Sequence, residues 1–196
     1  MLFVGHDEER ELVRRLRKGE PLAMREFYKR YGGFLSSVCS RYIGNDEDVK
    51  DIVQDCLIKI FGSIEKFEYR GKGSLKNWSV RITVNMSLDF IKKNDYRSIV
   101  SMDDDASFSV YGVSGVSDPE WDDPDVDGIP PDVVHAMIRE LPLGYRTVLN
   151  LFVIENRSHK EISELLGIKE TTSASQYHRA RIILAGKLNE YRKKHR

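Results

Sequence analysis

Residues 158–168 read SHKEISELLGI, and residues 169–188 continue as KETTSASQYHRARIILAGKL. Ser158 is suited to cap a helix, because Glu161 follows three residues later and the two can form a capping box. Gly167 is suited to the left-handed turn that ends such a helix. The pattern predicts a short helix over 159–166, a glycine turn and a longer helix from Thr171 or Thr172. This order is typical of a helix-turn-helix.

The longer helix is expected to have one polar face and one apolar face. At 100° per residue, one polar arc holds Thr172, Ser175, Gln176 and Arg179, and the opposite apolar stripe holds Tyr177, Ala180, Leu184 and Leu188. Arginine and glutamine suit base edges in the major groove, and Lys160 and Arg181 are expected to contact phosphates. The alternatives stay open: the arc also contains Ile183, a polar arc is often only a solvated face, and any helical hairpin produces this pattern.

Helical spacing also runs through the N-terminal half, where apolar residues recur at three- and four-residue steps. They include Phe27, Tyr31, Leu35, Val38, Ile52, Cys56, Ile60 and Ile64. A further helix is expected over 74–94, with the stripe Trp78, Ile82, Met86 and Phe90 packed on its neighbours. With helices also expected over 133–140 and 145–154, the fold class is all-α.

Charge divides the neutral chain of 196 residues into three parts. Residues 1–97 carry 19 basic and 15 acidic side chains, residues 98–132 carry 0 and 10, and residues 133–196 carry 12 and 6. The middle part is also rich in glycine, serine and proline, which disfavour a compact element. We therefore expect two small helical domains, 1–97 and 133–196, joined by a flexible acidic linker over 98–132.

A basic loop with aromatic side chains is expected just before the helix over 74–94. Residues 67–74 read FEYRGKGS and supply Phe67, Tyr69, Arg70 and Lys72, while Asn77, Arg81 and Asn85 follow on one face of the helix. Aromatic rings beside cations suit unpaired bases. The loop alone could equally be an ordinary loop, and Trp78 could be a core residue or support a base pocket.

Several functions are disfavoured by the sequence. The longest apolar stretch, 148–154, is far shorter than the ~20 residues of a bilayer span, and the first residues lack a secretion signal. A cytoplasmic protein without membrane insertion is therefore expected. Cys39 and Cys56 are expected to be reduced thiols near the core. No spacing suggests a catalytic constellation, a metal site or a cofactor, so we do not expect an enzyme.

The assembled motifs resemble the extracytoplasmic-function (ECF) group of bacterial sigma factors over nearly the whole chain. The first set is FYKRY at 27–31, DVKDIVQD at 48–55 and IKIF at 58–61. The second is SLKNW at 74–78 and RITVNMSLDFIKK at 81–93. The third is LP at 141–142, SHKEISELLGI at 158–168 and HRAR at 178–181.

The resemblance implies a protein that binds core RNA polymerase and directs it to promoter DNA. It places Asp51, Gln54 and Phe61 against the clamp coiled coil of the largest polymerase subunit, and it adds the polymerase flap and an anti-sigma factor as partners. The loop over 67–74 and Asn85 would capture bases of the minus-ten element, and Ser175, His178 and Arg179 would read the minus-thirty-five element. The acidic linker would thread polymerase channels, although a plain solubilising spacer explains its charge equally well.

Two departures and three alternatives accompany the resemblance. Many members of the group have basic residues where this chain has Ala174 and Gln176, so fewer phosphate contacts are expected. A repressor that works without polymerase needs no surface at Asp51 and Gln54. A protein-binding adaptor needs no Arg179 face, and a nucleic-acid enzyme needs acid-base or metal-binding residues.

Overall fold

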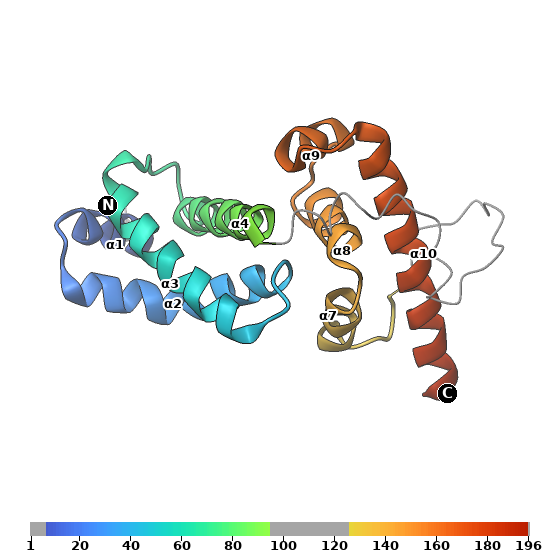
Figure 1. The fold of residues 1–196 in the computed structure, drawn as a ribbon. Helices are drawn as coiled ribbons and strands as arrows, with labels where there is room; N and C mark the ends of the chain where they lie inside the picture. Colours follow the sequence, from blue (N-terminus) through green and yellow to red (C-terminus); the bar gives the residue numbers. More distant parts are fainter. Residues whose placement is uncertain (1–6, 95–125, 196) are drawn as a thin grey trace, which may run out of the picture. The chain divides into compact units, whose positions relative to one another are not determined.

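The computed structural model describes residues 7–94 and 126–195, and every regular element in these ranges is a helix. The elements are α1 (Glu8–Arg17), α2 (Pro21–Ser40), α3 (Asp46–Ser63), η1 (Ile64–Lys66), α4 (Ser74–Asn94), α7 (Pro131–Arg139), α8 (Leu143–Leu149), η3 (Asn150–Ile154), α9 (His159–Leu166) and α10 (Glu170–Lys194). The chain divides into two compact units between Asp89 and Phe90, near the end of α4. The expected all-α architecture with two helical domains is confirmed (Figure 1).

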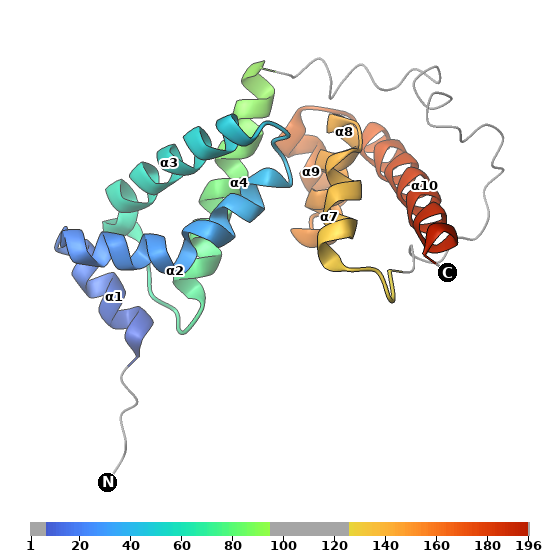
Figure 2. The same cartoon turned by 90° about the horizontal axis from the view of Figure 1, so that it is seen from below.

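The N-terminal unit is built on α2 and α3, which lie side by side, while α4 crosses the pair (Figure 2). Its core contains Phe27, Leu35 and Ile60, none of which is exposed to solvent. The Phe27 ring centroid lies 5.0 Å from that of Tyr31 and 5.5 Å from that of Phe61. Burial of each large apolar side chain contributes about 1.5–3 kcal/mol, so the predicted apolar spacing of α2 and α3 directly fixes this core.

The buried side of α4 differs from the predicted one. Trp78, Ile82, Met86 and Phe90 are only half-buried, whereas the small polar residues Ser79, Thr83 and Ser87 are completely buried. Their hydroxyls donate to the carbonyls four residues earlier, at 2.8, 3.1 and 2.9 Å. A hydroxyl that is satisfied within its own helix costs little to bury, and its small side chain lets neighbouring helices approach closely.

The two cysteines face this buried side of α4. The Ser87 hydroxyl lies 3.4 Å from the Cys39 sulfur, and both Cys39 and Cys56 are buried, free thiols. Burial raises the pKa of the Cys56 thiol to about 11, which keeps it protonated. The expectation of reduced thiols at the core is confirmed.

The C-terminal unit is organised by α10, which packs against α7, α8 and α9 (Figure 1). Its core includes Tyr145, Leu149, Ala180, Leu184 and Leu188. The predicted apolar stripe of the last helix therefore does face inward. The helix predicted over 145–154 corresponds to α8, which begins at Leu143 rather than at Tyr145 and continues into the π-helix η3.

The second folded unit begins earlier than the linker prediction allowed. Ile129 is buried in the same core as Tyr145, and α7 begins at Pro131. Proline is favoured in the first turn of a helix because its missing N–H has no intrahelical partner there. The end of the predicted linker, 126–132, thus belongs with the C-terminal unit, and its part over 98–125 lies outside the described residues.

Candidate nucleic-acid interface

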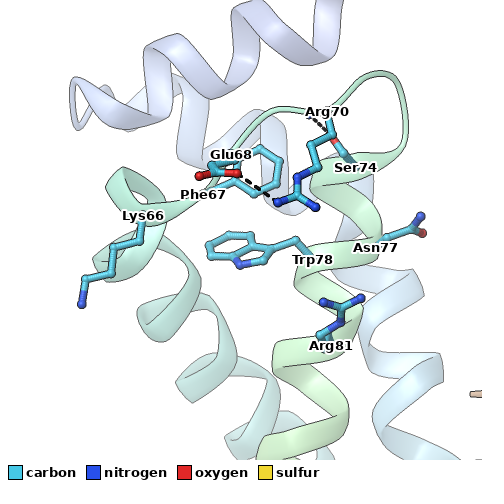
Figure 3. Close-up of a pocket in the computed structure, with 8 residues that line it drawn as sticks. All are labelled: Lys66, Phe67, Glu68, Arg70, Ser74, Asn77, Trp78 and Arg81. Carbon is cyan, nitrogen blue, oxygen red and sulfur yellow. Dashed lines mark hydrogen bonds and ion pairs between the residues drawn. The ribbon is translucent and has the colours of Figure 1, made fainter. Parts of the chain in front are cut away.

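A cavity of about 410 Å³ opens where the loop over 67–73 meets the first turns of α4 (Figure 3). Its lining residues are Lys66, Phe67, Glu68, Arg70, Ser74, Asn77, Trp78 and Arg81. Four of the seven residues predicted to contact the minus-ten element therefore come together: Phe67, Arg70, Asn77 and Arg81. Sequence spacing alone did not single out Lys66, Glu68 and Ser74.

The indole of Trp78 is the aromatic surface of this cavity. Trp78 is half-buried, and its ring centroid lies 5.0 Å from that of Phe67. Phe67 is only 4% exposed and belongs to the hydrophobic core. The Phe67 ring therefore lines the cavity from beneath and supports the indole from the protein side. Trp78 packs against the core and also lines the cavity.

Charges around the cavity favour an anionic ligand with a flat apolar part. Lys66, Arg70 and Arg81 line it together with one carboxylate, Glu68, which pairs with Arg70 at 3.0 Å. Figure 3 shows the Arg70 and Arg81 side chains on the Trp78 side of the cavity, while Asn77 points away from the indole. Guanidinium groups suit phosphates, and an indole suits a base.

The other three predicted minus-ten residues lie outside the cavity lining. The Tyr69 hydroxyl donates to Asp7, and this bond raises the pKa of Tyr69 to about 12, so the phenol stays protonated. Lys72 is exposed on the loop. Asn85 is exposed two turns beyond Asn77 on α4, and with Arg81 the three form one exposed stripe that begins at the pocket.

A second exposed surface lies on α3 of the same unit. Asp51 and Gln54 are exposed, and one turn further Ile58 is 71% exposed, so all three share one face. Phe61, predicted to join them, is half-buried with its ring against Phe27, so it lies mainly beneath this surface. Sequence reasoning missed Ile58, although its phase, two residues from the buried Ile60, indicates an outward position.

The helix-turn-helix is confirmed in its local geometry. The Ser158 hydroxyl accepts from the Glu161 N–H at 3.3 Å, the Glu161 carboxylate accepts from the Ser158 N–H at 2.9 Å, and Gly167 has φ 69°. The longer helix α10 begins at Glu170, one or two residues earlier than predicted. The pattern of cap and glycine was sufficient because both are local backbone requirements.

The capping box makes the stability of the C-terminal unit depend on pH. The hydrogen bond that the Glu161 carboxylate accepts from the Ser158 N–H lowers the pKa of Glu161 most, and the contact with Arg157 at 2.8 Å is the next largest cause. Together they lower this pKa to about 2. Because the pKa of Glu161 is lower in the folded than in the unfolded state, its ionised carboxylate stabilises the fold above about pH 4.5, and this contribution is lost as the pH falls towards 2.

We expect Glu161→Gln to lower the melting temperature at pH 7. The difference in melting temperature between the variant and wild type should narrow as the pH falls from about 4.5 towards 2. Glu164→Gln, on the same helix, is the control, and a difference that is constant with pH would contradict the assignment.

Two residues of the predicted reading face point into the protein. Gln176 is completely buried and Thr172 is 7% exposed. A Cβ at Gly144 would lie 3.2 Å from the Gln176 side-chain oxygen, so Gln176 packs directly on α8. The prediction that Thr172 and Gln176 face the major groove is therefore wrong. The signal was present in the sequence, because Ile183 lies about 20° from Thr172 around the helix and is itself buried.

The other side chains predicted to contact the minus-thirty-five element are accessible to solvent. Lys160 and His178 are exposed, while Ser175, Arg179 and Arg181 are half-exposed. The Arg181 guanidinium lies 5.6 Å from the centroid of the Tyr177 ring, a cation-π contact that orients its side chain. The solvent-exposed part of the predicted reading face therefore lies away from Gln176 and towards His178.

The burial of Gln176 leads to a prediction that separates stability from DNA reading. Gln176→Ala is expected to lower the free energy of unfolding by about 1–3 kcal/mol, because its removal leaves a cavity and disturbs buried polar groups. It should leave the ranking of duplex sequences unchanged. His178→Ala, which removes an exposed side chain, should have the opposite profile, with stability within about 0.5 kcal/mol of wild type. Urea unfolding and competition binding measure the two effects, and a changed sequence ranking for Gln176→Ala would contradict the burial argument.

The pocket and the helix-turn-helix together define a helical nucleic-acid-binding protein. The family described as Sigma-70 region 2 matches residues 27–97, and the family described as Sigma-70, region 4 matches residues 132–184. The first match begins in α2 and ends just after α4, and the second begins within the first turn of α7 and ends within α10.

Curated relatives are similar to this chain over most of its length. The ECF RNA polymerase sigma factor SigW of Bacillus subtilis is 28% identical over 180 residues, which cover 91% of this chain and 95% of SigW. The ECF RNA polymerase sigma-E factor of Haemophilus influenzae is 26% identical over 186 residues, which cover 92% of this chain and 95% of that protein. The chain belongs to the ECF group of RNA polymerase sigma factors, and it directs promoter-specific initiation of transcription.

Two further observations concern the described residues. Within 7–94 and 126–195, no three His, Cys, Asp or Glu side chains are grouped so as to hold a metal ion. In the same part of the chain, no helix combines the length and the apolar character needed to cross a bilayer.

Proposed function

We propose that the two units divide promoter recognition between them. The N-terminal unit holds core RNA polymerase and traps bases of the opened minus-ten element, and the C-terminal unit binds the minus-thirty-five element as intact duplex. The observation that carries this proposal is the cavity at the start of α4, where an indole and two guanidinium groups meet. It lies on the unit whose α3 exposes Asp51 and Gln54.

In this proposal, strand opening at the minus-ten element is achieved by binding. Stacking of one base on an aromatic ring contributes about 1–3 kcal/mol, which offsets an unstacking cost of a few kcal/mol per step. Trp78 offers the ring, Arg70 and Arg81 face the phosphates, and Lys72 lies further along the loop. Asn77 and Asn85 present amides along the exposed stripe of α4. Phe67 and Tyr69 contribute by holding the loop rather than by contacting bases.

The surface on α3 is assigned to polymerase. Ile58 supplies an exposed apolar centre, and Asp51 and Gln54 supply hydrogen-bonding groups beside it. An apolar centre with a polar rim is typical of a protein interface. The resemblance to the ECF group supports the clamp coiled coil of the largest subunit as the partner, with Phe61 shaping the surface from beneath.

The C-terminal unit is assigned to the duplex. Ser175, His178 and Arg179 are the side chains proposed for base edges, and Lys160 and Arg181 are those proposed for phosphates. Ala174 is exposed where a basic residue would add a phosphate contact, so a shallow salt dependence is expected. The resemblance supports the polymerase flap as a further partner of this unit.

Control by an anti-sigma factor fits the remaining exposed apolar surface of the N-terminal unit. Leu22 is 68% exposed and Tyr28 is 58% exposed, both on α2. Since polymerase and promoters are in the bacterial cytoplasm, the proposed function places the chain there, and it requires no catalytic step by the chain itself.

Run-off transcription tests this function. The full-length chain, purified core RNA polymerase and a library of genomic promoter fragments should give transcripts from a small set of starts, and core enzyme alone should not. If the chain neither joins the core enzyme nor starts transcription at any fragment but still binds a specific duplex, a repressor that acts without polymerase replaces the proposal.

A further inference from the structure

We propose that α1 sets the shape of the base-capturing loop, with the buried carboxylate of Glu9 as the main positioning group. The inference rests on the proposed function of the loop and deepens it. Helix α1 precedes the residues matched by the region 2 family, which begin at Phe27. The role assigned to α1 follows from its contacts with the two ends of the loop.

Glu9 joins the end of the loop to the start of α4. It is 6% exposed, its Oε2 accepts from the Gly73 N–H at 2.8 Å, and its Oε1 accepts from the Leu75 N–H at 2.9 Å. The Tyr31 hydroxyl lies 3.4 Å from Oε2. Both carboxylate oxygens are therefore used, which is what a buried carboxylate requires.

The first amides of α4 have no capping side chain next to them in sequence. The residue before Ser74 is Gly73, which has no side chain to accept from the first turn, and the first N–H groups of a helix need acceptors. Glu9 supplies the acceptors from more than 60 residues away, and its negative charge suits the positive end of the helix. The start of α4, which bears the cavity-lining residues Asn77 and Trp78, is thus positioned by α1.

The other end of the loop is held by the same helix and its cap. Arg17 Nη2 donates to the Phe67 carbonyl at 2.5 Å, and Tyr69 donates to Asp7, the N-cap of α1. In the part of the loop that follows these two anchors, Gly71 has φ 118° and Gly73 has φ 89°. Glycine adopts such angles at no steric cost, so the loop backbone is intrinsically adaptable. The anchors from α1 select one shape, and this is the shape in which Arg70 faces the Trp78 cavity.

Glu9→Gln tests the proposal, because an amide keeps the shape of the side chain but has one acceptor oxygen where Glu9 uses two. Glu8→Gln is the matched control: it removes the same charge from the adjacent residue, whose carboxylate is exposed and pairs with Arg30 at 3.1 Å. The probe is a single-stranded minus-ten oligonucleotide with 2-aminopurine, taken from a promoter found by run-off transcription. Its fluorescence reports capture by holoenzyme, and a pull-down reports association with core polymerase.

We expect Glu9→Gln to weaken capture of the single strand about tenfold, in line with the loss of a charge-assisted hydrogen bond. Association with core polymerase should stay within about twofold, since α3 is not part of the contact. A merely structural role would lower both quantities together with the melting temperature. Glu8→Gln should leave both unchanged.

The outcomes are distinguishable. Capture by Glu9→Gln that equals wild type, with wild type capturing, overturns the positioning role and leaves the proposed function intact. Absence of capture by wild-type holoenzyme instead removes the proposed function. If circular dichroism shows that Glu9→Gln does not fold, Arg17→Met is tested in the same capture assay. Arg17 is exposed, and its replacement removes the donor to the Phe67 carbonyl at the other end of the loop. Wild-type capture by Arg17→Met would then contradict the proposal.

Discussion

Alanine at both Asp51 and Gln54 is expected to weaken association with core RNA polymerase by about 30-fold, which corresponds to roughly 2 kcal/mol. Both side chains are exposed on α3 beside Ile58, so their loss changes the proposed contact surface without opening the core. The buried residues of α3, such as Ile52 and Ile60, are untouched. Titration of labelled core enzyme with the variant measures the loss.

The control for this surface is a double replacement elsewhere in the same part of the chain. Lys59→Ala with Glu65→Ala removes two exposed polar side chains, one on α3 away from the Asp51 face and one on η1. It should leave polymerase affinity within about twofold. If both double variants bind like wild type, the α3 surface is not the polymerase contact. If both lose affinity equally, the effect is one of charge or stability.

Arg179→Ala is expected to lose about 1–3 kcal/mol of affinity for the minus-thirty-five duplex, through loss of a base contact. Arg179 is half-exposed on the outer side of α10, next to the exposed His178. The loss should be concentrated on one base pair, so that substitution of this pair affects wild type but no longer affects the variant. Competition binding with a set of single-substitution duplexes identifies the pair.

Lys193→Ala is the matched control for Arg179. It removes one positive charge from the exposed C-terminal end of the same helix. It should change affinity only slightly and equally for all duplexes. An equally uniform loss for Arg179→Ala would make Arg179 a phosphate contact and would assign base reading to Ser175 or His178.

Local backbone signals made much of the fold predictable. The capping box at Ser158 and the left-handed Gly167 depend on neighbouring residues only, and the structure has both. The apolar spacing from Phe27 to Ile64 was likewise sufficient for α2 and α3, because large side chains at helical steps leave few other ways to form a core. The pocket residues were also near one another in sequence, within 66–81.

Two of the errors, on α4 and on α10, share a physical origin, namely polar side chains that take positions in the interior. Ser79, Thr83 and Ser87 return their hydroxyl bonds to α4, and Gln176 packs on Gly144, so each takes a buried position that hydrophobic spacing reserves for apolar residues. The contacts of α1 with the loop could not be predicted for a different reason. Glu9 and Leu75 are 66 positions apart, and no local pattern pairs a carboxylate with amides at that separation.

The most direct test of the division of labour is site-specific photocrosslinking in the open complex. A benzophenone amino acid is placed at Asn77 in one variant and at His178 in another, both exposed positions. We expect the group at 77 to react with the single-stranded minus-ten element and the group at 178 to react with the minus-thirty-five duplex. Crosslinks from both positions to the same element, or from 77 to duplex DNA alone, would contradict the account.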